Sequence, residues 1–342
     1  MVNYLELFRN TINSRPTYND RDDNVLIIDG LNSWIRIWQA IPVLSATGDH
    51  TGAVGGFLKS VGGNIRQFSP TRCIIIFDGA GGSQRRRKVF SGYKSNRTPN
   101  PNQFKKEFTS RDDEHRSMKQ QIGRVLEYLE LLPITVFSID QIEADDAIAE
   151  TVSLLKNKSK SITIVSSDRD FLQLVSENVS VWSPIKKILY TPEQIRTDYG
   201  VLHENFLLYR ALTGDASDAI PGLPGLGIKT LIKEYPIHEN KLDIESFIQL
   251  TEEKSSASSK KIFKNILENL EMLHLNYKLM QLHDVDISLF SKNKIRDYIS
   301  APIDKFNRHK ILQMLIADNL SQNWNVDSWC SNTFEYLNLW TT

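Results

Sequence analysis

The sequence contains very little cysteine. Only Cys73 and Cys330 occur among its 342 residues, so neither a disulfide framework nor a cysteine-based zinc site is expected. This usage fits a reducing cytoplasm. The first ten residues, MVNYLELFRN, also lack the order of charged, apolar and small residues that marks a secretory signal. The composition therefore predicts a cytoplasmic protein.

Long hydrophobic runs are absent as well. The runs at residues 25–28 and 73–77 are among the longest, and both fall far below the roughly 18 residues that a membrane-spanning helix needs. No membrane association is expected. These runs read instead as strands buried inside a soluble protein, whose length allows two or three domains.

Several enzyme motifs are missing. There is no G-x-S-x-G elbow, no Walker-type G-x-x-x-x-G-K-[ST] loop and no evident Ser/His/Asp set. Residues 225–230 end like a Walker loop, but their spacing differs and no buried strand precedes them. These absences disfavour nucleotide hydrolysis.

The net charge is zero, with 41 Lys and Arg against 41 Asp and Glu. A net charge of zero excludes little. An enzyme that acts on nucleic acid can concentrate acidic residues in its active site and basic residues along its binding groove. The distribution is uneven: residues 79–120 hold eleven Lys and Arg against four Asp and Glu, a local excess of seven positive charges. Such a run is often only a solvated surface, and phosphate binding is the alternative interpretation.

Four continuous apolar runs predict the strands of a sheet that is covered on both faces. Helical stretches separate them, for example residues 116–132 and 144–155. This order of strands and helices favours an α/β fold with a mainly parallel sheet. Beyond residue 190 the sequence changes to helices joined by turns rich in Gly and Pro. The four predicted strands are residues 25–28, 73–77, 134–137 and 162–165.

Acidic residues follow all four predicted strands. Each alone is most simply a helix cap or a turn residue. Together they indicate a site, because the carboxyl ends of parallel strands meet at one edge of the sheet. So many carboxylates in one crevice would repel one another unless cations were bound. Oxygen ligands without His or Cys favour Mg²⁺ or Mn²⁺ over Zn²⁺, and such ions point to phosphate chemistry. The acids are Asp29, Asp78, Glu143, Asp145, Asp146, Asp168 and Asp170.

Three motifs make the sequence similar to a known family. They are Glu143-Ala-Asp145-Asp146, the segment SDRDFLQL at 167–174 and the segment TGDASDAIPG at 213–222. In this order they resemble the 5′-nuclease or flap endonuclease family, especially its bacteriophage enzymes and the nuclease domain of bacterial DNA polymerase I. The resemblance covers roughly residues 25–235. It implies a PIN-like, mainly parallel sheet flanked by helices, with a helical arch and a helix–two-turn–helix DNA-binding subdomain.

The resemblance also implies two divalent ions, Mg²⁺ or Mn²⁺. The ion nearer the catalytic water would be held by Asp29, Asp78, Glu143, Asp145 and Asp168. The second ion would be held by Asp170, Asp215 and Asp218, with Asp146 in support. The division of ligands between the ions stays open, because these acids are coupled to one another.

The basic segment would form the arch of the family, about residues 80–120, through which a single-stranded 5′ end passes. Lys94 and Arg97 would be catalytic residues beside the scissile phosphate and would stabilise the charge that develops on it. Tyr93 would stack on an unpaired base, although helix packing explains aromatic residues as often. The other DNA contacts expected here are Arg85, Arg86, Arg87 and Lys88.

The turn at residues 221–227 has the composition of a phosphate-binding element. Gly222, Gly225 and Gly227 permit tight turns and leave backbone N–H groups free to face a phosphate. A plain turn between two packed helices is the alternative. By resemblance the turn would grip the duplex backbone and hold a K⁺ ion. The helix after it would contact phosphate through Lys229, Thr230 and Lys233.

Together these observations predict a structure-selective 5′ nuclease. It would hydrolyse phosphodiester bonds at 5′ flaps or 5′ ends of duplex DNA, RNA primers included, by a two-metal-ion mechanism in replication or repair. A PIN-type ribonuclease and a non-catalytic branched-DNA-binding protein are the alternatives. We expect a monomer in the cytoplasm, that of the host if a phage encodes it. Its expected partners are branched or flapped DNA, RNA/DNA primer ends, and a replication protein such as a single-strand-binding protein or sliding clamp.

The expected domains follow the same reasoning. The C-terminal segment is treated as a separate unit because it matches no motif. Its aromatic residues either pack within the protein or bind a replication partner. The domains are a lead-in (1–24), the α/β nuclease core (25–195), the helix–two-turn–helix subdomain (196–300) and a helical, aromatic C-terminal segment (301–342).

Overall fold

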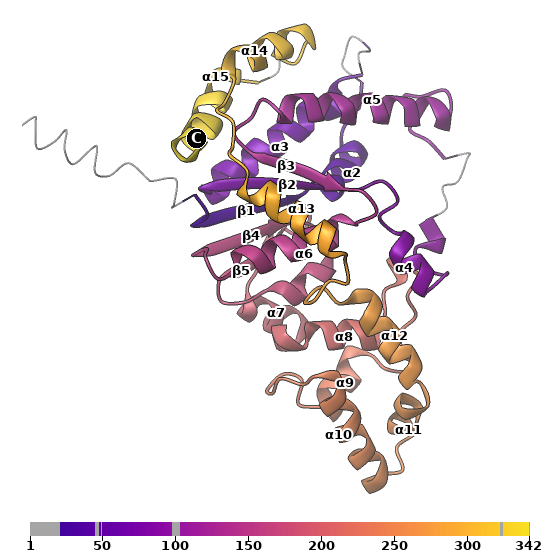
Figure 1. Cartoon of the computed structure of the whole chain (residues 1–342). Helices are drawn as coiled ribbons and strands as arrows, with labels where there is room; N and C mark the ends of the chain where they lie inside the picture. Colours follow the sequence, from indigo (N-terminus) through magenta and orange to yellow (C-terminus); the bar gives the residue numbers. More distant parts are fainter. Residues whose placement is uncertain (1–20, 45–47, 49, 98–102, 322–323, 342) are drawn as a thin grey trace, which may run out of the picture.

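The computed structural model of the chain describes residues 21–44, 48, 50–97, 103–321 and 324–341. Its centre is a six-stranded sheet with the order β3-β2-β1-β4-β5-β6 (Figure 1). Neighbouring strands pair in parallel except β5 and β6, which are antiparallel. The fold is therefore the mainly parallel α/β class that the sequence predicts. The strands are β1 (Asn24–Asp29), β2 (Arg72–Asp78), β3 (Thr135–Ile139), β4 (Ser161–Val165), β5 (Val179–Ser183) and β6 (Ile188–Tyr190).

The central strands are buried because both of their faces are apolar. In β1, Val25 and Ile27 belong to one hydrophobic core, and Leu26 and Ile28 belong to the other. All four predicted strands are confirmed. Strands β5 and β6 were not predicted, since β5 has a short alternating pattern, Val-Ser-Val-Trp-Ser, instead of a continuous apolar run, and β6 has only three residues.

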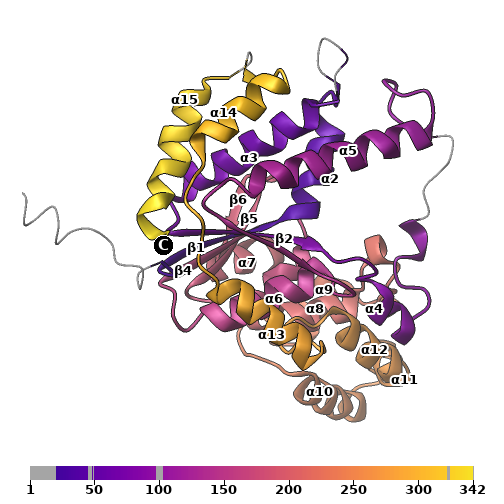
Figure 2. The ribbon, with the colours of Figure 1, turned by 45° about the horizontal axis from the view of Figure 1, so that its top comes forward.

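Helices cover the sheet on both faces (Figure 2). On one face lie α2 (Gly30–Ala40), α3 (Gly52–Phe68) and α5 (Arg111–Leu129). On the other lie α6 (Ala144–Leu155), which packs against β2, and α13 (Leu289–Ser300), which packs against β3 and α6. None of the helices in the described part of the chain combines the length and apolar character needed to cross a bilayer.

Helix α5 begins five residues earlier than the sequence pattern predicts. Ser110 caps it by accepting a hydrogen bond from the backbone N–H of Asp113 at 3.1 Å. Three acids, Asp112, Asp113 and Glu114, occupy its first turn, where the helix dipole favours negative charge. These polar residues carry no hydrophobic periodicity, so the start of the helix could be recognised only from its cap.

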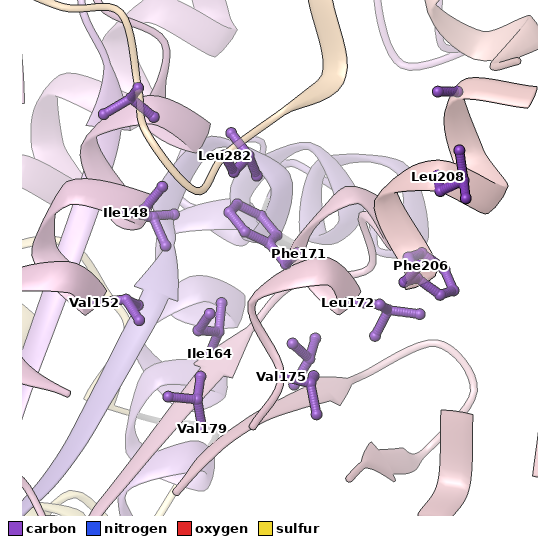
Figure 3. Packing of buried hydrophobic residues seen from close by; sticks show 14 of the residues in the cluster. Ile148, Val152, Ile164, Phe171, Leu172, Val175, Val179, Phe206, Leu208 and Leu282 are labelled. Carbon is purple, nitrogen blue, oxygen red and sulfur yellow. The ribbon is translucent and has the colours of Figure 1, made fainter. Parts of the chain in front are cut away.

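Beyond β6 the chain is helical, as expected, and it shares a core with the sheet. Figure 3 shows Phe171 and Leu172 of the 3₁₀ helix η3 (Arg169–Leu174) among Ile164 of β4 and Phe206 of α8. This shared core fixes η3 and the end of α8 relative to the strand ends. The helices here are α7 (Pro192–Tyr199), α8 (Phe206–Thr213), α9 (Ile228–Glu234), α10 (Ile244–Ala257), α11 (Lys261–Glu268) and α12 (Leu270–Met280).

The C-terminal segment, with α14 (Arg308–Ala317) and α15 (Val326–Trp329), packs against α3. A Cβ added at Gly62 would lie 2.3 Å from Nε1 of Trp329, so the two surfaces are in close contact. Phe334 is fully buried, and Trp324 stacks on Trp329 with ring centroids 4.9 Å apart. Packing explains these aromatic residues, which was one of the two interpretations.

Candidate active site

Four of the predicted acids line one pocket at the carboxyl edge of the sheet. Strand β1 lies between β2 and β4, and the point where strand order reverses opens a crevice in sheets of this kind. The pocket has a volume of about 300 Å³, and Lys94 and Arg97 also line it. The acids are Asp29 at the end of β1, Asp78 at the end of β2, Asp145 in α6 and Asp168 after β4.

Asp29 is held by the start of α2 and by the loop after β4. Its carboxylate accepts a hydrogen bond from the backbone N–H of Asn32 at 3.0 Å and another from the hydroxyl of Ser166 at 3.0 Å. Burial is the main reason that the pKa of Asp29 is raised to about 7; the charges of Asp78 and Asp168 act in the same direction, and the hydrogen bonds oppose it. A cation in the pocket would favour the ionised form.

Asp78 reaches the N-terminus of α6 because the backbone after it is tightly packed. A Cβ at Gly79 would lie 1.7 Å from the carbonyl oxygen of Ile139, so only glycine fits there. Asp78 then accepts a hydrogen bond from the backbone N–H of Ala144 at 2.9 Å. Burial raises the pKa of Asp78. It also raises the pKa of Asp145 well above the usual range, with the charge of Asp168 adding to the effect.

The other two acids at the start of α6 are paired with basic residues. Glu143 forms ion pairs with Arg86 and Lys94. Asp146 accepts hydrogen bonds from Arg86 at 2.8 Å and from Arg85 at 2.7 Å. Burial opposes the ionisation of Glu143, but the charges of Arg86 and Lys94 outweigh it, so the pKa of Glu143 lies below its ordinary value. These pairs lock the first turn of α6 against α4 (Gln84–Val89).

Two residues that were expected to contact DNA are buried beneath the acids. Arg86 exposes 5% of its surface and Tyr93 exposes 3%. Arg86 also donates a hydrogen bond to the carbonyl of Leu279 at 2.9 Å, and the Tyr93 hydroxyl lies 3.3 Å from a carboxylate oxygen of Glu143. Their burial corrects the expectation of DNA contacts, because neither side chain faces the surface. The other predicted contacts on this segment are half-buried or exposed: Arg85, Arg87 and Lys88.

A second acidic group, Asp170, Asp215 and Asp218, lies beside the first. Arg210 of α8 donates a hydrogen bond to Asp170 at 2.9 Å and pairs with Asp215, and Arg97 pairs with Asp218. Burial, with the charge of Asp168, raises the pKa of Asp170 to about 7.

For Asp215 the charge of Arg210 and a hydrogen bond from Ser217 outweigh burial, and the pKa is lowered. Sequence reasoning missed Arg210. Its only signal is a basic residue on the helix that leads into the TGD motif.

The turn at residues 221–227 leaves its backbone open on one side. Gly222 packs so closely against Thr213 that a Cβ would lie 2.2 Å from the Thr213 carbonyl oxygen. Gly225 has a φ of 74°, and a Cβ at either Gly225 or Gly227 would meet open space. Gly227 precedes the first residue of α9. On α9 the predicted contacts are exposed or half-buried: Lys229, Thr230 and Lys233.

Basic side chains of the protein hold several of these carboxylates. Within the described residues, no three Asp, Glu, His or Cys side chains are grouped so that they could hold an ion as they stand. Lys94, Arg97 and Arg210 therefore relieve part of the repulsion, which corrects the expectation that bound cations alone would do so. The donors still fit a hard cation, because the pocket presents carboxylate oxygens whose ionisation burial disfavours.

Fold and site together define a class of protein. A PIN-like, mainly parallel sheet carries a pocket of carboxylates at its switch point, and basic residues adjoin that pocket. This arrangement suits an enzyme that acts on phosphate esters, such as a nuclease.

The comparisons with known proteins agree. Residues 24–200 match the family model of the 5′-3′ exonuclease, N-terminal resolvase-like domain. The 5′-3′ exonuclease of Buchnera aphidicola is 30% identical over 281 residues, which cover 82% of this chain and 92% of that protein. The 5′-3′ exonuclease of Aquifex aeolicus is 33% identical over 269 residues, covering 77% of this chain and 83% of that protein. The chain belongs to the 5′-3′ exonuclease family, and it is a phosphodiester hydrolase.

Solved structures share the fold. The flap endonuclease of bacteriophage T5, in a complex with DNA and metal ions, has a TM-score of 0.61 at 19% identity and covers 86% of this chain and 98% of its own. Flap endonuclease-1 from Methanococcus jannaschii has a TM-score of 0.52 at 17% identity and covers 96% of both chains. At these identities the likeness establishes the fold.

Proposed function

We propose that this nuclease is structure-selective and hydrolyses phosphodiester bonds at 5′ flaps or 5′ ends of duplex DNA. RNA primers are among its substrates, and it acts in replication or repair in the cytoplasm. One observation carries the proposal: Lys94 and Arg97 line the same pocket as four carboxylates from separate elements. The carboxylates can then hold cations, and the basic side chains can attract phosphate, at the same phosphodiester bond.

In this proposal Lys94 and Arg97 exchange a carboxylate partner for a phosphate when substrate binds. In the structure Lys94 pairs with Glu143 and Arg97 pairs with Asp218. The side chain of Lys94 is 14% exposed and that of Arg97 is 52% exposed, so both are reached from the open side of the pocket. When a phosphodiester lies there, each is able to exchange its carboxylate for a phosphate oxygen and stabilise the charge of the transition state.

The cofactors we propose are two divalent ions, Mg²⁺ or Mn²⁺. When bound, such ions activate a water molecule and neutralise charge on the phosphate. The chain orients the carboxylate oxygens, since Asp29 is fixed by Asn32 and Ser166. The acids proposed for the first ion are Asp29, Asp78, Glu143, Asp145 and Asp168, and those for the second are Asp170, Asp215 and Asp218.

Duplex DNA would be held by exposed basic side chains and by exposed protein backbone. Arg87 and Lys88 are exposed at α4, and Lys229 and Lys233 are exposed on α9. Contacts with phosphate position a duplex without reading its sequence, which supports selection by structure. We also propose that the open backbone at residues 222–227 contacts phosphate and holds a K⁺ ion. A monomeric state and a replication partner stay predictions.

The test compares a 5′-flapped DNA duplex with an RNA hairpin in Mg²⁺, with EDTA as the blank. Faster cleavage of the flap supports the proposal, and faster cleavage of the hairpin would favour a PIN-type ribonuclease. Tight binding of an uncut flap across a titration of Mg²⁺ and Mn²⁺ would favour a branch-binding protein. Asp145→Asn is the inactive variant, and Asp297→Asn, on the exposed face of α13, is the matched control.

A further inference from the structure

We propose that Arg210 is a built-in counter-ion of the second acidic group, and that it weakens ion binding there and so sets the order in which ions bind. Arg210 is a positioning residue, since it acts through Asp170 and Asp215. The inference rests on the proposed function, because it concerns the ions which that function requires.

Arg210 is buried and bound on several sides. It lies in α8 and exposes 3% of its surface. Its guanidinium donates hydrogen bonds to Asp170 at 2.9 Å and to the carbonyl oxygen of Gly214 at 3.2 Å, and it forms an ion pair with Asp215. The planar fork of arginine suits such simultaneous contacts. Arg210 therefore joins η3 to the loop after α8 at the centre of the second group.

Of the five acids proposed for the first ion, Glu143 is paired with Arg86 and Lys94, whereas the four that line the pocket have no such partner in the described part of the chain. Lys94 and Arg97 line this pocket, but their ion pairs are with Glu143 and Asp218. Across the described ranges, no ion pair joins a Lys or Arg to any of the four pocket carboxylates. These four are Asp29, Asp78, Asp145 and Asp168.

Because of this difference in charge, the two acidic groups differ in their affinity for a divalent cation. The four unpaired carboxylates attract it strongly, whereas three carboxylates with two paired arginines attract it much less. Arg97 has an exposed side chain and can turn away. Arg210 cannot leave without moving a charge through the protein interior. The first group therefore fills first, and Arg210 keeps the second site weak.

The experiment counts ions bound to the full chain in the absence of DNA. Mn²⁺ is titrated and the free ion is followed by electron paramagnetic resonance, for the wild type, Arg210→Gln and Arg210→Lys. Glutamine removes the charge and keeps a hydrogen-bonding amide, whereas lysine keeps the charge. Arg72→Gln is the matched control, because Arg72 is 1% exposed and pairs with Asp22 at 2.8 Å, at the opposite end of β2 from Asp78.

We expect the wild type to bind one Mn²⁺ tightly and a second roughly tenfold or more less tightly. In Arg210→Gln the second step becomes roughly tenfold or more tighter. Arg210→Lys and Arg72→Gln bind both Mn²⁺ ions with the affinities of the wild type. A purely structural role of Arg210 would lower stability without tightening this step.

An unchanged or weaker second step in Arg210→Gln would overturn the inference. A tenfold gain in Arg210→Lys would do so as well, because lysine retains the charge. If Arg210→Gln is unfolded without ions, we expect Mn²⁺ to restore its fold. A variant that stays unfolded at saturating Mn²⁺ would also overturn the inference. If the wild type binds no Mn²⁺, the proposed function itself fails.

Discussion

Replacing Asp29 by asparagine is expected to stabilise the ion-free protein while it abolishes cleavage. The ordinary pKa of this carboxyl group is 3.8, and in the folded protein the pKa is about 7. Between these values the folded state keeps a proton that the unfolded state has released, so a rise in pH favours unfolding. The difference of about 3 pKa units corresponds to about 4 kcal/mol of stability, which is lost as the pH rises from about 4 to above 7.

Asparagine cannot ionise, yet it can replace both hydrogen bonds of Asp29, the one with Ser166 in the reverse direction. Its amide oxygen can accept from the backbone N–H of Asn32, and its amide nitrogen can donate to the hydroxyl of Ser166. In EDTA we therefore expect a gain of about 1 kcal/mol at pH 4.5 and about 4 kcal/mol at pH 8. Urea unfolding at both pH values measures it. The exposed control Asp297→Asn should change stability by less than about 0.5 kcal/mol.

Ion binding gives the same prediction a second test. Addition of Mg²⁺ at pH 8 should stabilise the wild type more than Asp29→Asn, because the variant lacks one ligand. The reasoning is refuted if Asp29→Asn is less stable than the wild type at pH 8 in EDTA, or if its gain is the same at both pH values.

Three further substitutions test the site and the fold. Asp168→Asn should abolish turnover and keep most of the affinity for flapped DNA, measured by fluorescence anisotropy, and loss of both together would contradict a ligand role. Lys94→Ala should lower kcat by more than it raises KM in steady-state assays, because its charge acts on the transition state; a change in KM alone would speak against this. Trp329→Ala should cost about 3–5 kcal/mol in urea unfolding, because the ring is buried against α3, and a loss below 1 kcal/mol would reject packing of the C-terminal segment.

The four predicted strands and the acids after them were readable from the sequence because each depends on a short stretch of chain. A continuous apolar run such as residues 73–77 predicts a strand buried on both faces, and Asp78 follows it directly. The position of α6 was readable in the same way from residues 144–155. Strands β5 and β6 and the start of α5 were missed, since a short alternating strand, a strand of three residues and a polar first turn carry little hydrophobic pattern.

Tertiary structure decided which charged residue faces which partner. Four consecutive basic residues at 85–88 look alike in the sequence, yet Arg86 is buried against Glu143, 57 positions away. Arg210 meets Asp170 across 40 positions, and no local pattern marks that contact. The sequence by itself therefore determined the central strands of the sheet and the acidic residues that follow them at its edge. Only the folded chain decided which acids are paired and which stay open to a cation, because pairing depends on groups that long-range packing brings together.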